Sequence, residues 1–366
     1  SAALASGCQA IHPGFGFLSE NPDFAERITQ AGLAFIGPTA ATIRLMGDKS
    51  EAKRNAIAAG VPVALGTDGP LRDFDEAISE AERIGYPVML KAASGGGGKG
   101  IRVAESVKDL KDAYDSASAE AIANFGDGRL YMEKYIHNPR HIEVQILGDN
   151  YGNVVHLFER ECSVQRRHQK LIEESPSAFV TPELREKMTS AAVALAKRVG
   201  YRNAGTIEFL VDNDRNFYFC EMNTRIQVEH PVTEEVTGVD LVCEQLRVAA
   251  GEPLSFKQED LTIRGHAIEC RINAEDPSRN FAPCPGTLVS LHLPGGPGVR
   301  VDSAAYQGYK IPPFYDSMIG KLIVYGADRE QAIVRMRRAL AEMLFEGVVT
   351  ATDYQMHILC SKAFVE

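Results

Sequence analysis

The chain has 366 residues, of which 45% are hydrophobic and 24% are charged, so it is long enough for two or three domains with sizeable cores. Its formal net charge of −10 argues against a nucleic acid or an anionic membrane surface as a partner. No apolar run approaches the length of a transmembrane helix, so we also expect no membrane insertion.

The seven cysteines are scattered along the chain and no two of them have CxxC spacing. An odd number without paired spacing predicts neither a disulfide framework nor a zinc site. Free thiols fit a reducing compartment, and we therefore expect a cytoplasmic protein.

The first sixty residues predict short alternating elements. In order, these are a helix, a strand at 9–11, a glycine-rich turn at 12–21, a helix at 21–31, a strand at 34–36, and helices within 42–60 that are broken at 46–49. The turn on its own is explained by a tight strand-to-helix connection. A hinge or linker is expected at 66–70, where glycine and proline cluster.

Residues 71–135 predict a small α/β domain. Its expected elements are a helix at 74–84, strands at 88–91 and 101–104, a helix at 106–125 and a strand at 130–136. The loop at 92–100, AASGGGGKG, lets backbone N–H groups approach a polyphosphate closely, and a flexible hairpin tip is the alternative. It is not a Walker A loop, since no Gly-Lys-Ser/Thr follows.

The middle of the chain predicts strands followed by a helix. Residues 141–147 alternate apolar and polar side chains, which is typical of a half-buried strand. A second strand at 154–159 leads into a basic run at 160–170, for which a solvated basic patch is one reading. Residues 181–199 predict a capped helix that ends at Gly200.

Two short runs, 206–211 and 217–222, predict a β-hairpin around a cluster of turn formers. If Asp212 pairs with Phe217, Glu208 falls directly opposite Glu221, and both carboxylates share one face. Opposed like charges repel, and a bound Mg²⁺ carrying a nucleotide would remove the repulsion. The alternative is an exposed hairpin with two solvated acids.

The C-terminal third predicts a helix at 239–250, a strand at 265–273 that carries the lone Arg271, and a long helix at 329–346. An arginine on a strand is usually an edge or ion-paired residue.

The run at 221–234, EMNTRIQVEHPVTE, resembles the active-site strand of biotin carboxylases, which belong to the ATP-grasp superfamily. HPGFGFLSEN at 12–21, MGDK at 46–49, RRHQK at 166–170 and ECRIN at 269–273 match the same family, so the resemblance covers almost the whole chain. It implies a mixed α/β (α+β) ATP-grasp fold. The expected parts are an N-terminally truncated remnant of a Rossmann-like domain at 1–45, a small lid domain at 46–135, a large catalytic domain at 136–250 and a C-terminal biotin carboxylase domain at 251–366.

The resemblance also implies site residues. For ATP they are Lys49, Lys91, Gly97, Gly98, Glu133, Lys134, Ile136, His141, Gln165, His168, Glu208 and Glu221. For Mg²⁺ or Mn²⁺ they are Glu208, Glu221 and Asn223; for bicarbonate, Lys170, Arg225, Gln227 and the backbone of Val228; for biotin, Arg271. Lys170, Arg225, Glu229 and Arg271 are the expected catalytic residues, with Glu229 as the base.

The function implied by the resemblance is the ATP-dependent carboxylation of biotin with bicarbonate, through carboxyphosphate. The implied partners are a biotin carboxyl carrier, a carboxyltransferase and a second copy of the chain, because the turn at 294–300 has its counterpart at a homodimer interface. The final acceptor, an acyl-CoA or pyruvate, is left open. Two alternatives are another ATP-grasp ligase, such as a carbamoyl-phosphate-forming unit, and a non-catalytic nucleotide-binding fragment.

Overall fold

The structure is a computed structural model, and it describes residues 1–93, 100–167 and 169–366. The predicted ATP contacts Gly97, Gly98 and His168 lie outside these residues. No helix in the described ranges is long and apolar enough to cross a membrane.

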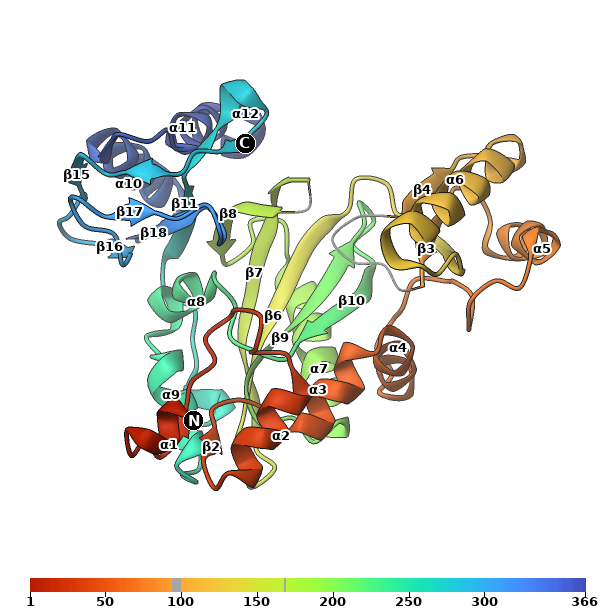
Figure 1. Cartoon of the computed structure of the whole chain (residues 1–366), viewed down its shortest axis with the longest axis horizontal. Helices are drawn as coiled ribbons and strands as arrows, with labels where there is room; N and C mark the ends of the chain where they lie inside the picture. Colours follow the sequence, from red (N-terminus) through yellow and green to blue (C-terminus); the bar gives the residue numbers. More distant parts are fainter. Residues whose placement is uncertain (94–99, 168) are drawn as a thin grey trace.

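The N-terminal segment forms a small layer of helices beside two parallel strands (Figure 1). Its elements are α1 (Ala2–Ala5), β1 (Ala10–Ile11), α2 (Pro22–Gln30), β2 (Ala34–Phe35), α3 (Ala40–Gly47) and α4 (Lys49–Ala58). The predicted break between two helices falls at Asp48, whose side chain accepts hydrogen bonds from the backbone N–H groups of Ser50 and Glu51. This cap starts α4 at Lys49.

A second unit stands to one side of the molecule in Figure 1. It contains α5 (Phe74–Ile84), β3 (Val88–Ala92), β4 (Ile101–Ala104), α6 (Val107–Phe125) and β5 (Leu130–Lys134). The strands form an antiparallel sheet in the order β4-β3-β5. Leu90, Leu110 and Met132 are fully buried between this sheet and the helices, so the unit has a core of its own.

The centre of the molecule is an eight-stranded antiparallel sheet in the order β10-β9-β6-β7-β8-β11-β18-β16 (Figure 1). Its strands are β6 (Arg140–Gly148), β7 (Val154–Arg166), β8 (Gln169–Ser175), β9 (Asn203–Val211), β10 (Phe217–Asn223), β11 (His266–Asn273), β16 (Val299–Asp302) and β18 (Met318–Gly326). Because β8 pairs with β11, the sheet runs without interruption from the central part of the chain into the C-terminal part.

Helices cover both faces of this sheet. They are α7 (Pro182–Arg198), α8 (His230–Thr237), α9 (Leu241–Ala249), α10 (Arg329–Glu342), α11 (Thr352–Cys360) and α12 (Lys362–Val365). Helix α7 packs with α4 against Ile142, Val144 and Phe209. Helix α10 packs against the even-numbered side chains of β11, whereas α8 covers Ala267 on the opposite face.

Short pairs of strands complete the C-terminal part. These are β12 (Glu275–Asp276) with β13 (Ala282–Pro283), β14 (Gly286–Thr287) with β17 (Lys310–Ile311), and β15 (Ser290–His292) with β19 (Leu344–Glu346). The predicted helix at 329–346 therefore ends early, at Glu342, and its last residues form β19 instead.

The predicted hairpin of β9 and β10 forms, but its register differs from the one expected. Phe217 pairs with Val211 rather than with Asp212, and a β-bulge between Phe219 and Glu221 then shifts the register by one residue. After the bulge Glu221 stands opposite Glu208, so the predicted pairing of the two carboxylates is confirmed. The bulge at Cys220 places Glu221 opposite Glu208. Bulges near functional sites often change the direction of a side chain in this way.

One expectation for the central strands is wrong, and one of the two interpretations of the basic run is excluded at its start. Strand β6 is not half-buried, because Glu143 and Gln145 on its polar face are fully buried as well. The basic run after 159 is not a solvated patch at its start, because β7 continues to Arg166 and Arg160 is fully buried. Both differences arise because polar side chains of several strands satisfy one another inside the molecule.

Candidate active site

The site is organised around the ammonium group of Lys170 on β8. Its Nζ atom lies 2.5 Å from Glu143 Oε2 on β6, 2.8 Å from Glu208 Oε1 on β9 and 2.6 Å from Glu229 Oε1 just before α8. Three carboxylates from separate parts of the chain thus meet at one partly buried cation. Lys170 and Glu208 are predicted site residues that the structure brings together, whereas Glu143 is an addition.

The electrostatics of this cluster depend on burial and pairing together. Burial lowers the pKa of Lys170, but Glu143 and Glu229 outweigh burial and raise that pKa well above its usual value. For Glu208, burial raises the pKa, yet Lys170 and His141 outweigh this effect and bring it down to about 2. Lys170 is therefore a fixed positive charge and Glu208 a fixed negative one at neutral pH.

Glu229 joins this cluster to Arg271 on β11. Arg271 Nη2 lies 2.9 Å from Glu229 Oε2, and Arg271 Nε lies 2.5 Å from Glu173 Oε1 on β8. Glu229 is fully buried, which raises its pKa, but Lys170 and Arg271 more than compensate and hold it well below the ordinary value. Lys170 and Arg271, two of the three predicted catalytic cations, thus share one carboxylate.

Glu208 is also the centre of a polar set on the β9–β10 side. Asn223 Nδ2 and Gln227 Nε2 donate hydrogen bonds of 2.8 and 3.1 Å to Glu208 Oε1, and His141 Nε2 lies 2.8 Å from Glu208 Oε2. The side chain of Glu221 is exposed, yet partial loss of hydration and repulsion from Glu208 raise its pKa. A divalent cation between the two acids would relieve this repulsion, so the donor set fits Mg²⁺.

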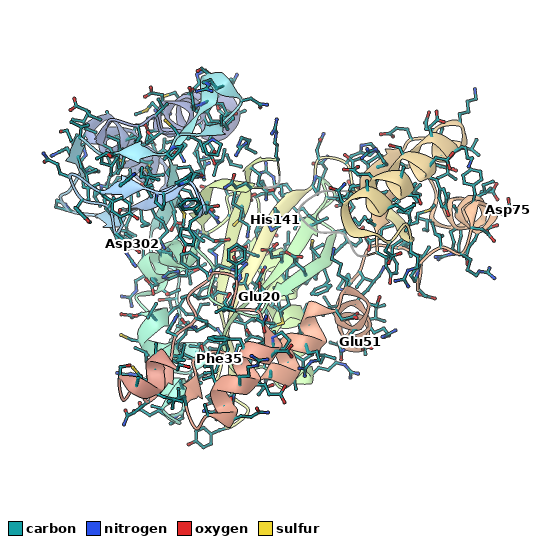
Figure 2. The ribbon with its side chains drawn as sticks, viewed as in Figure 1. Glu20, Phe35, Glu51, Asp75, His141 and Asp302 are labelled. Atoms are coloured by element: carbon teal, nitrogen blue, oxygen red, sulfur yellow. The ribbon has the colours of Figure 1, made fainter. Side chains whose placement is uncertain are left out.

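The guanidinium of Arg225 donates to the side chains of three neighbours and to the carbonyl of Ile226. Its Nε atom donates to Glu20 Oε2 at 2.9 Å, Nη1 donates to Gln227 Oε1 at 3.1 Å and Nη2 donates to Asn223 Oδ1 at 3.1 Å. Glu20 comes from the loop before α2 and also accepts a 2.9 Å hydrogen bond from the Thr224 N–H. Figure 2 labels Glu20 and His141, which both lie over the central sheet. The N-terminal segment therefore supports the guanidinium fork directly.

The second group of predicted ATP contacts lies on and beside the small sheet. Lys91 Nζ donates to Glu133 Oε2 at 2.6 Å, and Lys53 Nζ lies 3.7 Å from Glu133 Oε1. Lys134 Nζ donates to the carbonyls of Gly85 and Tyr86, so its side chain is used within the fold. Lys91 and Glu133, both predicted to contact ATP, thus form an ion pair with each other.

The remaining predicted residues are distributed around these groups. Lys49 is the first residue of α4 and its charge acts on Glu221. Gln165 turns back to its own strand and donates a 2.8 Å hydrogen bond to Cys162 O, and Ile136 follows the end of β5. The carbonyl of Val228 accepts a 2.8 Å hydrogen bond from Lys321 Nζ on β18.

Four residues of the network were not among the sequence-based candidates: Glu20, Glu143, Arg160 and Glu173. Arg160 is fully buried and its guanidinium bonds Glu143, Gln145, Thr206 and Thr233. The alternating polar face of 141–145 was the available signal for Glu143, because a polar face that proves to be buried must find polar partners. For Arg160 and Glu173 the sequence did not indicate whether the side chain points into the protein or toward solvent.

Three family models match successive parts of the chain. Residues 1–43 match the biotin carboxylase N-terminal domain, residues 48–257 match the ATP-binding domain of the carbamoyl-phosphate synthase L chain, and residues 269–366 match the biotin carboxylase C-terminal domain. The fold and the acidic, lysine-containing site thus belong to the ATP-grasp class of ligases. The two flanking matches favour the biotin carboxylase prediction over a carbamoyl-phosphate-forming unit.

Individual relatives lead to the same assignment. The chain is 54% identical over 366 residues to biotin carboxylase 1 of Bacillus subtilis, covering 100% of this chain and 81% of that protein. It is 55% identical over 366 residues to the biotin carboxylase of a Nostoc species, covering 100% of this chain and 82% of that protein. The chain therefore belongs to the biotin carboxylase family, whose members are ATP-dependent ligases that carboxylate biotin.

Solved structures agree with the predicted fold. The Campylobacter jejuni biotin carboxylase in complex with β-γ-ATP superposes with a TM-score of 0.94 at 51% identity, covering 100% of this chain and 81% of that one. The biotin carboxylase domain dimer of Hydrogenobacter thermophilus 2-oxoglutarate carboxylase, in complex with MgADP, ADP and bicarbonate, gives a TM-score of 0.93 at 53% identity over 99% of this chain and 80% of that one. The ATP-grasp fold prediction is confirmed.

Proposed function

We propose that the chain activates bicarbonate with MgATP on the Lys170 side of Glu229 and carboxylates biotin on its Arg271 side. One observation carries this proposal: Glu229 bonds both cations, at 2.6 Å to Lys170 and 2.9 Å to Arg271. The two half-steps would then take place within one hydrogen-bonded cluster, and the intermediate would have little distance to travel.

In the first step an oxygen of bicarbonate attacks the γ-phosphorus of ATP, the bond to ADP breaks, and carboxyphosphate forms. We assign the binding of bicarbonate to Lys170, Arg225, Gln227 and the backbone of Val228, because an arginine fork suits a flat anion. Lys49, Lys91 and His168 would offset phosphoryl charge. Gly97, Gly98, Glu133, Lys134, Ile136, His141 and Gln165 are proposed further contacts of the nucleotide.

Glu208, Glu221 and Asn223 would hold the metal. A bound Mg²⁺ or Mn²⁺ neutralises charge on the β- and γ-phosphates. Lys170 already fills the space among Glu143, Glu208 and Glu229, so the cation fits best on the other side of Glu208, toward Glu221.

We propose that Glu229 is the base that accepts the proton of bicarbonate. Lys170 and Arg271 keep Glu229 ionised. A bound anion that shares these two cations would raise the pKa of Glu229 toward neutral pH, so that it could accept a proton. In the second step carboxyphosphate breaks into CO₂ and phosphate. The phosphate takes the N1′ proton of biotin, and N1′ attacks CO₂ while Arg271 stabilises the charge on the ureido oxygen.

The test is phosphate release from MgATP by the full-length gene product, without and with bicarbonate and then with free biotin. Release that requires bicarbonate and rises with biotin is expected. Arg271→Ala should reduce biotin carboxylation far more than bicarbonate-dependent ATP cleavage, and equal losses would contradict the division between the two cations. ATP binding without release would leave only a nucleotide-binding fragment.

We further propose a homodimer that works in the cytoplasm with a biotin carboxyl carrier and a carboxyltransferase. A solved biotin carboxylase domain at 53% identity is described as a dimer, which supports the first part. The seven cysteines are all free thiols, which supports a reducing compartment. Sedimentation of the purified chain would test the oligomeric state.

A further inference from the structure

Two buried carboxyl groups lie behind Arg271 and neither has been given a role so far. Glu173 on β8 and Glu269 on β11 are both fully buried, and they stand directly opposite each other in the antiparallel register of these strands. Directly opposed side chains in such a pair have their Cβ atoms about 5 Å apart on one face of the sheet. The two carboxyl groups are therefore immediate neighbours.

Three of the four carboxyl oxygens in this pair lack a hydrogen-bond donor within the described part of the chain. They are both oxygens of Glu269 and Oε2 of Glu173. The fourth, Glu173 Oε1, accepts the 2.5 Å hydrogen bond from Arg271 Nε. Because an unpaired buried carboxylate is costly, this arrangement requires a donor that the side chains around it do not supply.

The charged groups that face the pair come from each element packed against it. Arg271 lies two residues from Glu269 on β11, Lys321 lies on β18, and Glu229 and Lys170 lie beyond Arg271. Lys321 donates to the carbonyl of Val228, and its Nζ atom lies 3.5 Å from Asp302. Helix α8 covers this side with the fully buried Val232 and Val236, and its buried His230 is kept neutral by a lowered pKa. Two full negative charges at these positions would repel each other in a poorly hydrated space.

We propose that Glu173 and Glu269 share one proton, and that this carboxyl pair is a positioning device for Arg271. The shared proton joins Glu173 Oε2 to one oxygen of Glu269, so the other Glu269 oxygen is an uncharged carbonyl, and the pair keeps one negative charge, located on the Glu173 oxygen that faces Arg271. Glu173 then holds Nε of the guanidinium while Nη2 remains on Glu229. Loss of the proton would add a second charge behind Arg271 and draw its guanidinium away from Glu229.

The direction of the pKa values agrees with this arrangement. Burial raises the pKa of Glu173 to about 7 even though Arg271 opposes the rise. Burial raises the pKa of Glu269 well above its usual value, with repulsion from Glu173 adding to the effect and Lys321 opposing it. Two interacting acids titrate as a pair, so the expected signature is one proton retained through neutral pH.

The inference rests on the proposed role of Arg271, but one of its tests, an infrared measurement, does not depend on that role. A protonated carboxyl group has a C=O stretching band that a carboxylate lacks. Infrared difference spectra of the purified full-length protein against its Glu269→Gln variant should show such a band near neutral pH and its loss at alkaline pH. No band in this difference would overturn the shared proton, whatever reaction the enzyme catalyses.

The kinetic test follows the biotin step and bicarbonate-dependent ATP cleavage side by side across pH. Glu269→Gln keeps a donor beside Glu173 at every pH, so the alkaline limb of biotin carboxylation should move upward by about one unit or more. Glu173→Gln removes the anion from Arg271 and should reduce the biotin step by about 10- to 100-fold. It should reduce ATP cleavage much less, since that step is assigned to the Lys170 side.

Glu174→Gln is the matched control, because Glu174 is a buried neighbour on β8 that bonds His266 and Arg329 instead. This variant should lower the free energy of unfolding without shifting the alkaline limb of the pH profile of biotin carboxylation. If Glu269→Gln fails to fold, the Glu173→Gln variant still tests the pair, because the C=O band of protonated Glu269 should shift in frequency when its partner changes from a carboxylate to an amide, and an unshifted band would contradict the pair. Coincident pH profiles of the parent and Glu269→Gln proteins would refute the positioning role.

Discussion

Replacement of Arg160 by methionine tests whether the buried network, rather than the individual site residues, sets the geometry. Arg160 is fully buried, its Nε lies 2.5 Å from Glu143 Oε1, and its Nη1 donates to Gln145 at 2.7 Å. Methionine has a similar length but no charge, so Arg160→Met leaves Glu143 with Lys170 as its remaining cation.

The expected cost follows from breaking a buried ion pair, which typically lowers the free energy of unfolding by about 3–5 kcal/mol. Because Glu143 retains Lys170, we expect about 3 kcal/mol, the lower end of that range. The added Glu143→Gln change removes the charge that has lost one of its two cations, so the double variant should be more stable than the sum of the two single losses by about 1–3 kcal/mol.

Urea unfolding of the three variants measures these free energies, and bicarbonate-dependent phosphate release measures the consequence for the site. In Arg160→Met the freed Glu143 should draw Lys170 toward itself, and phosphate release should fall even in protein that remains folded. A loss of less than about 1 kcal/mol, or strict additivity of the two changes, would refute the reasoning.

Further predictions concern the metal, pH and the N-terminal contact. Glu208→Gln should raise the Mg²⁺ concentration needed for half-maximal phosphate release by about tenfold or more; an unchanged requirement would count against a metal on this hairpin. Burial lowers the pKa of His230 to about 3, so the folded protein holds this histidine neutral and stability should be full above about pH 6.5. Stability should then fall by up to about 5 kcal/mol as the pH drops toward 3, and the urea midpoint of His230→Gln should depend less on pH across this window; identical slopes would contradict the assignment. Glu20→Gln should raise the KM for bicarbonate by about tenfold while the KM for ATP stays the same, because Glu20 holds Arg225; a parallel rise in both constants would point to general disruption.

Much of the fold could be predicted from local signals. The helix at 74–84 and the strand at 101–104 have the predicted bounds, because capping residues, glycines and apolar periodicity all act over a few residues. The helix His230–Thr237 was not predicted, since its polar start was interpreted only as a set of site residues. The domain limits at 45, 135 and 250 stay predictions.

The candidate site was predictable where a side chain lies on a recognisable motif, and less so where it depends on the meeting of distant strands. Lys170 and Glu229 could be named from sequence. Lys170 and Glu229 share a network with Glu143, and Arg160 lies buried beneath that network. This arrangement depends on the order β9-β6-β7-β8 in the sheet, which no local pattern specifies. The bulge at Cys220 is a similar case, because it decides which carboxylates face each other but has no signature in composition.

The pairing of β8 with β11 has a consequence for how the chain can be divided. Limited proteolysis within 251–265, between α9 and β11, would cut the backbone but leave the strand ladder that joins the two pieces. A nicked protein should therefore migrate as one particle under native conditions and separate only in denaturant. Co-expressed halves should reassemble. The N-terminal piece alone would expose the unpaired edge of β8, which is an aggregation-prone surface. That piece would also lack Arg271.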